Sequence, residues 1–168
     1  MTEPIKVIGD ILRYELGLKP DQVLLYNQKF DIPPDYRMYI CLSILGSKQF
    51  AGYPDYDPDP ITGNLVETQV VNRQEMISIL VYSRSEEARV RNWEISAALV
   101  SAYSQQQQEA NSIKIATLPV SMNDVSEVEA TDRLNRYALT FMVLAAYKKQ
   151  KPVEYFDTFA PPVIFTNP

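Results

Sequence analysis

The sequence predicts an α+β fold in which an N-terminal helix and one long helix pack on a mainly antiparallel sheet, with a long hairpin projecting from it. Three observations support this prediction: amphipathic helical spacing near the N-terminus, apolar alternation in several later segments, and one long helical segment between them. The 168 residues, 46% hydrophobic and 22% charged, suit a soluble domain with a core. We assign residues 1–159 to this single domain and residues 160–168 to an extended C-terminal tail.

The first predicted helix spans Glu3 to Leu16. Thr2 can cap it, Pro4 suits its opening turn, and Gly17 suits the left-handed conformation that often ends a helix. Its apolar residues share one face: Ile5, Ile8, Leu12 and Leu16. We therefore expect this helix to cover one side of a sheet.

Two extended segments follow, Val23 to Lys29 and Arg37 to Leu45, separated by a turn at Pro33-Pro34-Asp35. The second segment alternates between an apolar face, formed by Met38, Ile40, Leu42 and Ile44, and a mixed face. This alternation is typical of a strand in a sheet that helices cover on one side.

Gly52 to Asn64 is rich in proline and aspartate, a composition that does not favour a regular element. A loop of this length in a compact domain is usually functional or disordered. The flanking segments Lys48 to Gly52 and Leu65 to Arg73 can form the arms of a long hairpin. We therefore expect the aspartate loop to be the projecting tip of that hairpin.

Gln74 to Ser83 alternates with the period of a buried strand and leads into a helix from Glu86 to Gln106. At 1.5 Å per residue this helix of about 20 residues is roughly 30 Å long. The residues expected on its inner side are Ala88, Asn92, Ile95, Leu99, Ala102 and Tyr103. Trp93 is expected to pack in the core or against a neighbouring subunit rather than to anchor a ligand.

The C-terminal third predicts further strands. Ile113 to Val120 is one candidate, and the acidic segment Ser121 to Asp132 forms either an exposed strand or a loop. Arg133 to Tyr147 contains alanine and leucine that would permit a helix, but its aromatic and β-branched residues favour a strand. Val153 to Phe159 is an aromatic extended segment before the tail at Ala160 to Pro168.

Composition excludes several classes of function. The chain has 16 basic and 21 acidic residues, a net charge of −5, which disfavours DNA binding through a basic surface. It has no histidine, the residue most used for proton transfer and zinc ligation near neutral pH. Cys41 is the single cysteine and is expected to be a buried, reduced thiol. No apolar run reaches the roughly 18 residues of a membrane span, and no signal peptide pattern is present.

The alternation of Asp55, Asp57 and Asp59 resembles the first half of a calcium loop. The sixth and twelfth positions of that loop, normally glycine and glutamate, are Pro60 and Val66 here. No two carboxylates are held at a defined separation, and no glycine-rich phosphate loop is present. We therefore predict no metal site, no cofactor, no catalytic residue and no enzymatic activity.

Aromatic residues in segments that cannot all belong to the core are candidates for an interface, because such residues are enriched where proteins meet. The late aromatic group either folds back on the sheet as an edge strand or joins that interface. The candidate interface residues are Tyr53, Asp55, Tyr56, Asp57, Asp59, Tyr155, Phe156 and Phe159.

This layout resembles the tail terminator (neck terminator) proteins of tailed bacteriophages. The resemblance covers about Ile5 to Phe159 and concerns layout rather than a catalytic motif. It rests on the cover helix, the projecting hairpin, the strand leading into the helix from Glu86 to Gln106, and the closing strand with Arg136-Tyr137. The segment Val153-Glu154-Tyr155-Phe156-Asp157-Thr158-Phe159 completes it.

The resemblance implies a structural virion protein, made in the host cytoplasm, that forms a homohexameric ring. Such a ring caps the tail tube, ends its polymerisation and docks on the head-side connector or stopper protein. A sheath protein is a further implied partner if the tail contracts. DNA would traverse the lumen without specific binding, which an acidic surface favours because carboxylates repel phosphates. The lumen candidates are Asp55, Asp57 and Asp59, or alternatively the segment from Asp124 to Asp132.

Two alternatives remain open from the sequence. One is another neck or head-completion ring component, although such proteins are more often helical. The other belongs to a different class, a small ligand-binding domain or carboxylate hydrolase, which would need a well-formed pocket.

Overall fold

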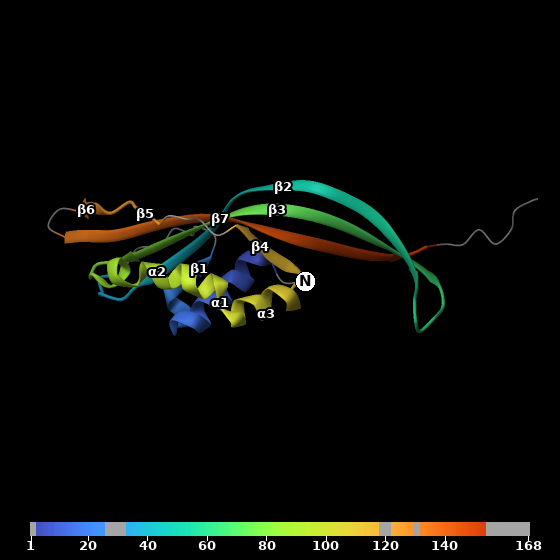
Figure 1. Ribbon diagram of the computed structural model, residues 1–168, viewed down its shortest axis with the longest axis horizontal. Coiled ribbons are helices and arrows are strands. Elements are labelled where there is room, and N and C mark those ends of the chain that lie inside the picture. The colour runs from blue at the N-terminus through green and yellow to red at the C-terminus, as the bar shows by residue number, and fades with distance from the viewer. Residues whose placement is uncertain (1–2, 26–32, 118–121, 130–131, 154–168) are drawn as a thin grey trace, which may run out of the picture.

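The computed structural model of the chain has helices layered against a mainly antiparallel sheet (Figure 1), so the predicted α+β class is confirmed. The residues described are 3–25, 33–117, 122–129 and 132–153. In chain order the elements are α1 (Pro4–Leu16), η1 (Pro20–Gln22), β1 (Val23–Leu25), β2 (Tyr39–Pro58), β3 (Leu65–Ser83), α2 (Glu87–Val100), α3 (Ala102–Ala110), β4 (Ile113–Thr117), β5 (Asn123–Asp124), β6 (Glu127–Glu129) and β7 (Asp132–Pro152).

The sheet has the strand order β1-β2-β3-β7-β4, and β5 and β6 also pair with β7. β1 runs parallel to β2, whereas the other pairs are antiparallel. β3 lies between β2 and β7 along its whole length. It unites two segments that the sequence suggested separately, Leu65 to Arg73 and Gln74 to Ser83.

Helices α1, α2 and α3 cover one face of only part of the sheet (Figure 1), and we call this helix-covered part the body. Along β3, Ile77, Ile79 and Val81 are fully buried and belong to the core cluster shared with the helices, as the alternation predicted. The core includes Ile5, Ile8, Leu12, Ile40, Leu42, Ile95, Leu99, Phe141 and Val143. Ile44 was expected on this apolar face but is 38% exposed, because it lies where the helix layer ends.

The predicted N-terminal helix is confirmed as α1. Gly17 ends it with a φ of 65°, the left-handed conformation that glycine adopts without steric cost. Arg91 of α2 fixes the C-terminus of α1 by donating to the Leu16 carbonyl oxygen at 3.1 Å. The same guanidinium pairs with Glu87 and Glu94, each at 2.8 Å, so its direction is set by three acceptors.

The single long helix predicted from Glu86 to Gln106 is wrong, because the chain breaks it at Ser101 into α2 and α3. Ser101 is extended, with φ −61° and ψ 160°, and its Oγ accepts a hydrogen bond from the Ser104 backbone N–H at 3.0 Å. Serine therefore caps a new helix instead of continuing the old one. As a result Ala102, expected to be buried, is exposed, while the Tyr103 ring stacks on Tyr14 with 4.1 Å between centroids.

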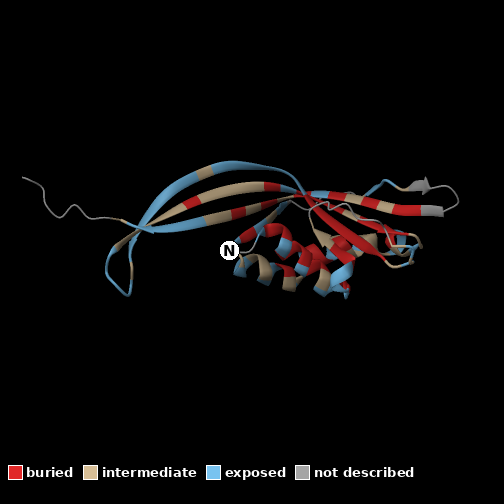
Figure 2. Cartoon of the chain, turned by 180° about the vertical axis from the view of Figure 1, so that it is seen from behind, coloured by how far each residue is buried: buried red, intermediate tan, exposed pale blue. Residues whose placement is uncertain are grey.

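Beyond the body, β2, β3 and β7 continue together as a three-stranded extension that we call the arm (residues 46–58, 65–74 and 146–152, with the turn 59–64). Figure 1 shows it arching away from the helices, and Figure 2 shows that its strands are mostly exposed or half-buried. The projecting hairpin is thus present, with β7 as an additional third strand along it.

The predicted irregular loop from Gly52 to Asn64 is wrong over most of its length, because β2 runs to Pro58 and only the turn 59–64 lies outside the strands. The Asp59 N–H bonds to the Asn64 carbonyl oxygen at 2.8 Å. Because backbone groups alternate in direction along an antiparallel strand, Pro54 and Pro58 then face away from β3. A proline at such an edge position breaks no hydrogen bond of the ladder.

The remaining strand predictions are confirmed within the described residues. The strand interpretation of Arg133 to Tyr147 is correct, and β7 continues to Pro152 because Lys148 to Pro152 pair with β3. β1 and β4 match the first parts of their predicted segments, and two short strands occur in the acidic segment before β7. Residues 26–29 and 118–120 of those segments, the late aromatic residues after Val153 and the tail 160–168 lie outside the described residues.

Candidate functional site

Four of the predicted interface residues lie on β2 in the arm: Tyr53, Asp55, Tyr56 and Asp57. The two tyrosines are 53% and 52% exposed, and both aspartates are exposed. Register places Asp55 beside Thr68 and Asp57 beside Val66, on the face opposite to the one that the helices cover in the body. Tyr56, beside Glu67, lies on the helix side. The residues are therefore divided between the two faces of the arm.

Asp59 differs from the other two aspartates because it organises the turn at the tip of the arm. Its carboxylate accepts hydrogen bonds from the Ile61 N–H at 2.9 Å and from the Thr62 hydroxyl at 2.8 Å. These bonds, the Ile61 one foremost, hold the pKa of Asp59 below its usual value. Gly63 completes the turn with a φ of 70°. Asp59 is consequently a turn-forming residue, in addition to its candidate role in an interface.

Tyr155, Phe156 and Phe159 fall outside the described residues. The two acidic groups considered for a lumen are separated: β5 and β6 lie at one end of the sheet, and the tip of the arm lies at the other (Figure 1). Asp124 in β5 accepts a hydrogen bond from the Ser126 N–H at 3.0 Å. The structure therefore does not bring the two acidic candidate groups together.

A polar cluster at the base of the arm was not found from the sequence. The Tyr147 hydroxyl donates to Glu75 Oε1 at 2.6 Å, and Glu75 is only 3% exposed. Burial, and then this hydrogen bond, raise the pKa of Tyr147. The Arg73 guanidinium lies 5.4 Å from the Tyr147 ring centroid and donates to Ser47 Oγ at 2.5 Å.

This cluster borders a cavity of about 210 Å³ that Glu3, Pro4 and Ile44 also line. The second carboxylate oxygen of Glu75 is buried and has no hydrogen-bond partner among the described residues. Glu75 occupies an inward position of β3 where an apolar residue is expected. The alternation of the strand therefore gives no reason to predict a functional role for it. Register pairs Glu75 with Val143 and Tyr147 with Val71, so only the position of the tyrosine side chain shows that Tyr147 is its hydrogen-bond partner.

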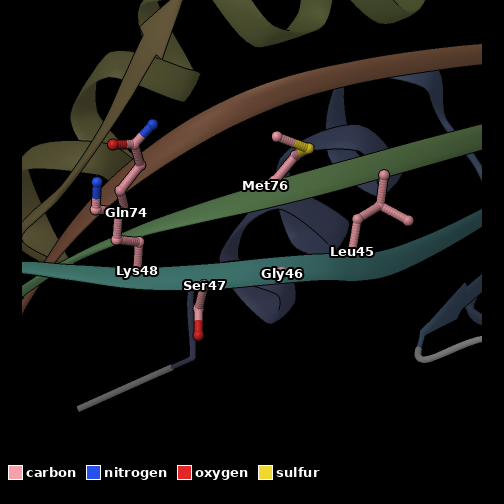
Figure 3. Close-up of a pocket in the computed structure, with 6 residues that line it drawn as sticks. All are labelled: Leu45, Gly46, Ser47, Lys48, Gln74 and Met76. Atoms are coloured by element: carbon pink, nitrogen blue, oxygen red, sulfur yellow. The ribbon is translucent and has the colours of Figure 1, made fainter.

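A second hollow, of about 420 Å³, lies at the junction of body and arm, where β2 has an irregular register with β3 (Figure 3). Leu45 and Met76 are 58% and 43% exposed, and in Figure 3 they rise on the same side of the strands as Gln74. Ser47 points to the other side. The hollow is open and has few polar groups, so it provides no convergent set of side chains for catalysis.

Helix α2 presents a further exposed apolar stripe. Val90, Trp93 and Val100 are 60%, 64% and 52% exposed, and their spacing places them on one side of the helix. The core alternative for Trp93 is therefore wrong, because the helix turns its other side, with Ile95 and Leu99, to the sheet. Packing against a neighbouring subunit stays a prediction.

A polar network at the start of β2 was likewise missed. The Arg37 guanidinium contacts Asp35 at 2.7 Å and Asp21 at 3.1 Å, and the Tyr39 hydroxyl donates to Asp35 at 2.8 Å. Burial raises the pKa of the Asp35 carboxyl, but the hydrogen bonds from Arg37 and Tyr39 outweigh it and lower that pKa. The network links Asp21 to the segment just before β2, and its charged groups pair with one another.

Among the described residues, no group of three or more metal-ligating side chains is assembled, and no helix combines the length and apolar character of a membrane span. Comparisons with known proteins give no family: no protein-family model matches the chain, and no curated protein is significantly similar to it. The function must therefore be argued from the body, the arm and their exposed surfaces.

Proposed function

We propose that the chain is a structural virion protein whose six copies form a ring that caps the tail tube of a tailed bacteriophage. The ring ends polymerisation of the tube and joins the tail to the head-side connector. The observation that carries the proposal is the long arm, which projects from a helix-covered body and exposes Tyr53 and Tyr56.

A cyclic ring needs two different surfaces on each subunit, because one surface meets the other on the next copy. The arm and the stripe of Val90, Trp93 and Val100 on α2 both present exposed surface for such contacts. Aromatic side chains are typical of interface centres. The arrangement therefore supports a role in assembly rather than in catalysis.

Charge supports the same proposal. The net charge of −5 favours passage of DNA through a lumen without adhesion. Asp55 and Asp57 are exposed carboxylates without a hydrogen bond or ion pair to any described residue. A hydrolase needs carboxylates fixed beside a substrate pocket, and these two lie on an open strand of the arm. We accordingly propose no enzymatic activity.

Native mass spectrometry over a range of protein concentrations tests ring formation directly. A six-fold species is expected, either from the chain alone or after addition of tail tubes. The capping role is tested by electron microscopy of tube assembly, where the ring should limit tube length. A dimer that never grows, with or without tubes, would contradict the proposal.

A deletion of Tyr53 to Gly63 tests the role of the arm. Circular dichroism should show that the body stays folded, because the core residues lie outside the deleted segment. Ring formation or tube docking should be weakened. Unchanged assembly of the deleted chain would count against any role of the tip.

A further inference from the structure

The arm has two edges that no described strand covers. On β2, the neighbour β1 pairs only with Ile40 to Leu42, so no described strand pairs with the outer edge from there to Pro58. On β7, β4 pairs as far as Ala145, and the Ala146 N–H bonds to the Ser112 carbonyl oxygen at 3.4 Å. From Tyr147 to Pro152 the outer edge of β7 has no described neighbour. Uncovered edges are the parts of a sheet that most readily meet another chain.

The two edges carry opposite charges. Asp55 and Asp57 lie on the β2 edge, and Lys148 and Lys149 lie on the β7 edge; all four are exposed. None of them forms a hydrogen bond or ion pair with another described residue. The neighbouring Lys151 is different, since it pairs with Glu67 at 3.0 Å. Each edge therefore presents charge that its own chain does not neutralise.

The opposite charges lie on neighbouring levels of the arm, with Asp55 nearer to the level of Lys148 than Asp57. Register aligns Asp55 with Thr68 and then with Gln150, so Asp55 is two residues from the level of Lys148. Because side chains alternate along a strand, Asp55, Asp57 and Lys148 share one face. Within one chain the β2 and β7 backbones are separated by β3, about 10 Å at 4.8 Å per strand spacing.

We infer that the arms of neighbouring copies lie side by side, with the Asp55 and Asp57 edge of one copy against the Lys148 and Lys149 edge of the next. This inference rests on the proposed ring. Copies related by rotation about a ring axis point the same way, and β2 and β7 run in the same direction because both are antiparallel to β3. When the arms run along the ring axis, rotation therefore brings β2 of one copy beside β7 of the next.

The contact is made by side chains rather than by a continuous backbone ladder. Pro54 and Pro58 face the outer edge of β2 and carry no N–H to donate. On the helix side of the arm, Tyr56 stands two residues from the level of Lys149, so the Lys149 side chain of the next copy must lean along the strand to make a cation–π contact with it. On the other face, Asp55 is the carboxylate that pairs with Lys148, and Asp57 adds negative charge two residues farther along the same edge.

Charge reversal at one edge at a time tests this contact. The acidic edge is changed by Asp55→Lys with Asp57→Lys, and the basic edge by Lys148→Glu with Lys149→Glu. In native mass spectrometry, each double variant alone should need at least tenfold more protein than the wild type to form rings. A mixture of equal amounts should assemble near the wild-type concentration and contain both variants in equal numbers, because each repairs the other's edges.

Glu109→Lys with Gln105→Lys and Gln106→Lys is the matched control, since all three residues are exposed on α3 and the change in net charge equals that of the acidic-edge variant. This control should form rings as the wild type does. Raising the salt from 0.1 M to 1 M shortens the Debye length from about 10 Å to about 3 Å and should weaken wild-type rings. Circular dichroism of each variant checks that the body is folded.

Rings formed by either edge variant alone at the wild-type concentration would overturn the inference. So would two impaired variants whose mixture does not assemble. A wild-type chain that forms no ring, even on tubes, would overturn both this inference and the proposed function. Rings that respond to the variants as expected but do not limit tube length would support the arm contact and contradict the tail-cap function.

Discussion

The contact between Tyr147 and Glu75 allows a sharp test of how the arm is anchored to the body. The Tyr147 hydroxyl lies 2.6 Å from Glu75 Oε1, Glu75 is 3% exposed, and its other oxygen has no described partner. Changing Tyr147→Phe removes the one donor that the described residues give this carboxylate but retains the ring that packs there. The change therefore isolates the hydrogen bond.

The expected loss follows from the burial of the acceptor. A hydrogen bond to a charged group contributes about 1.5 to 3 kcal/mol, and a buried acceptor left without its donor also loses solvation. We expect Tyr147→Phe to lower the free energy of unfolding by about 2 kcal/mol. With a urea m-value of about 2 kcal/mol/M, the midpoint of unfolding should fall by about 1 M.

Urea unfolding at neutral pH, followed by circular dichroism, measures this loss. Tyr53→Phe on the exposed part of the arm is the matched control and should change stability by less than about 0.5 kcal/mol. In a Glu75→Gln background the charge is absent, so Tyr147→Phe should cost about 1 kcal/mol or less. Equal losses in both backgrounds, or no measurable loss in the wild type, would refute the reasoning.

Three further predictions concern the stability of the folded chain. Leu99→Ala should destabilise the protein by about 2 to 5 kcal/mol because Leu99 is fully buried, whereas the exposed Val100→Ala should have little effect; urea unfolding compares them. Gly17→Ala should cost about 1 kcal/mol in the same assay, because alanine is strained at a positive φ. Burial raises the pKa of Tyr82 and Tyr147 above the usual value near 10, so their contribution to stability should be complete below pH 10 and decline as the pH rises further; the melting temperature against pH checks this.

The spacing of apolar residues predicted those helices and strands that bury one continuous face in the core. α1 and the body halves of β3 and β7 repeat apolar residues at helical or strand spacing because each packs against the same core. The same spacing did not predict the break between α2 and α3 at Ser101. Apolar spacing continues across it, and a single local hydrogen bond to Ser104 decides that a new helix begins.

The sequence predicted the projecting hairpin but placed too long a loop at its tip, because the proline and aspartate content of Gly52 to Asn64 disfavours a regular strand. Pro54 and Pro58 are compatible with β2 only because they face its outer edge, and the direction of a backbone group is a property of register, not of local sequence. The same limit applies to the candidate site. Asp55 and Lys148 are distant in sequence, and only pairing of both strands with β3 shows that they stand at neighbouring levels.

The outer edge of β2 carries two features, outward-facing prolines and exposed aspartates, and they affect association in different ways. A long uncovered strand invites open-ended pairing with other chains, and outward prolines oppose this by removing donors. They do not oppose contact through side chains, which in the inferred arrangement requires the basic edge of another copy beside the acidic edge. An edge that lacks backbone donors at its prolines but carries charged side chains can bind an oppositely charged edge without extending the sheet. That property favours a closed assembly over continued growth of the sheet.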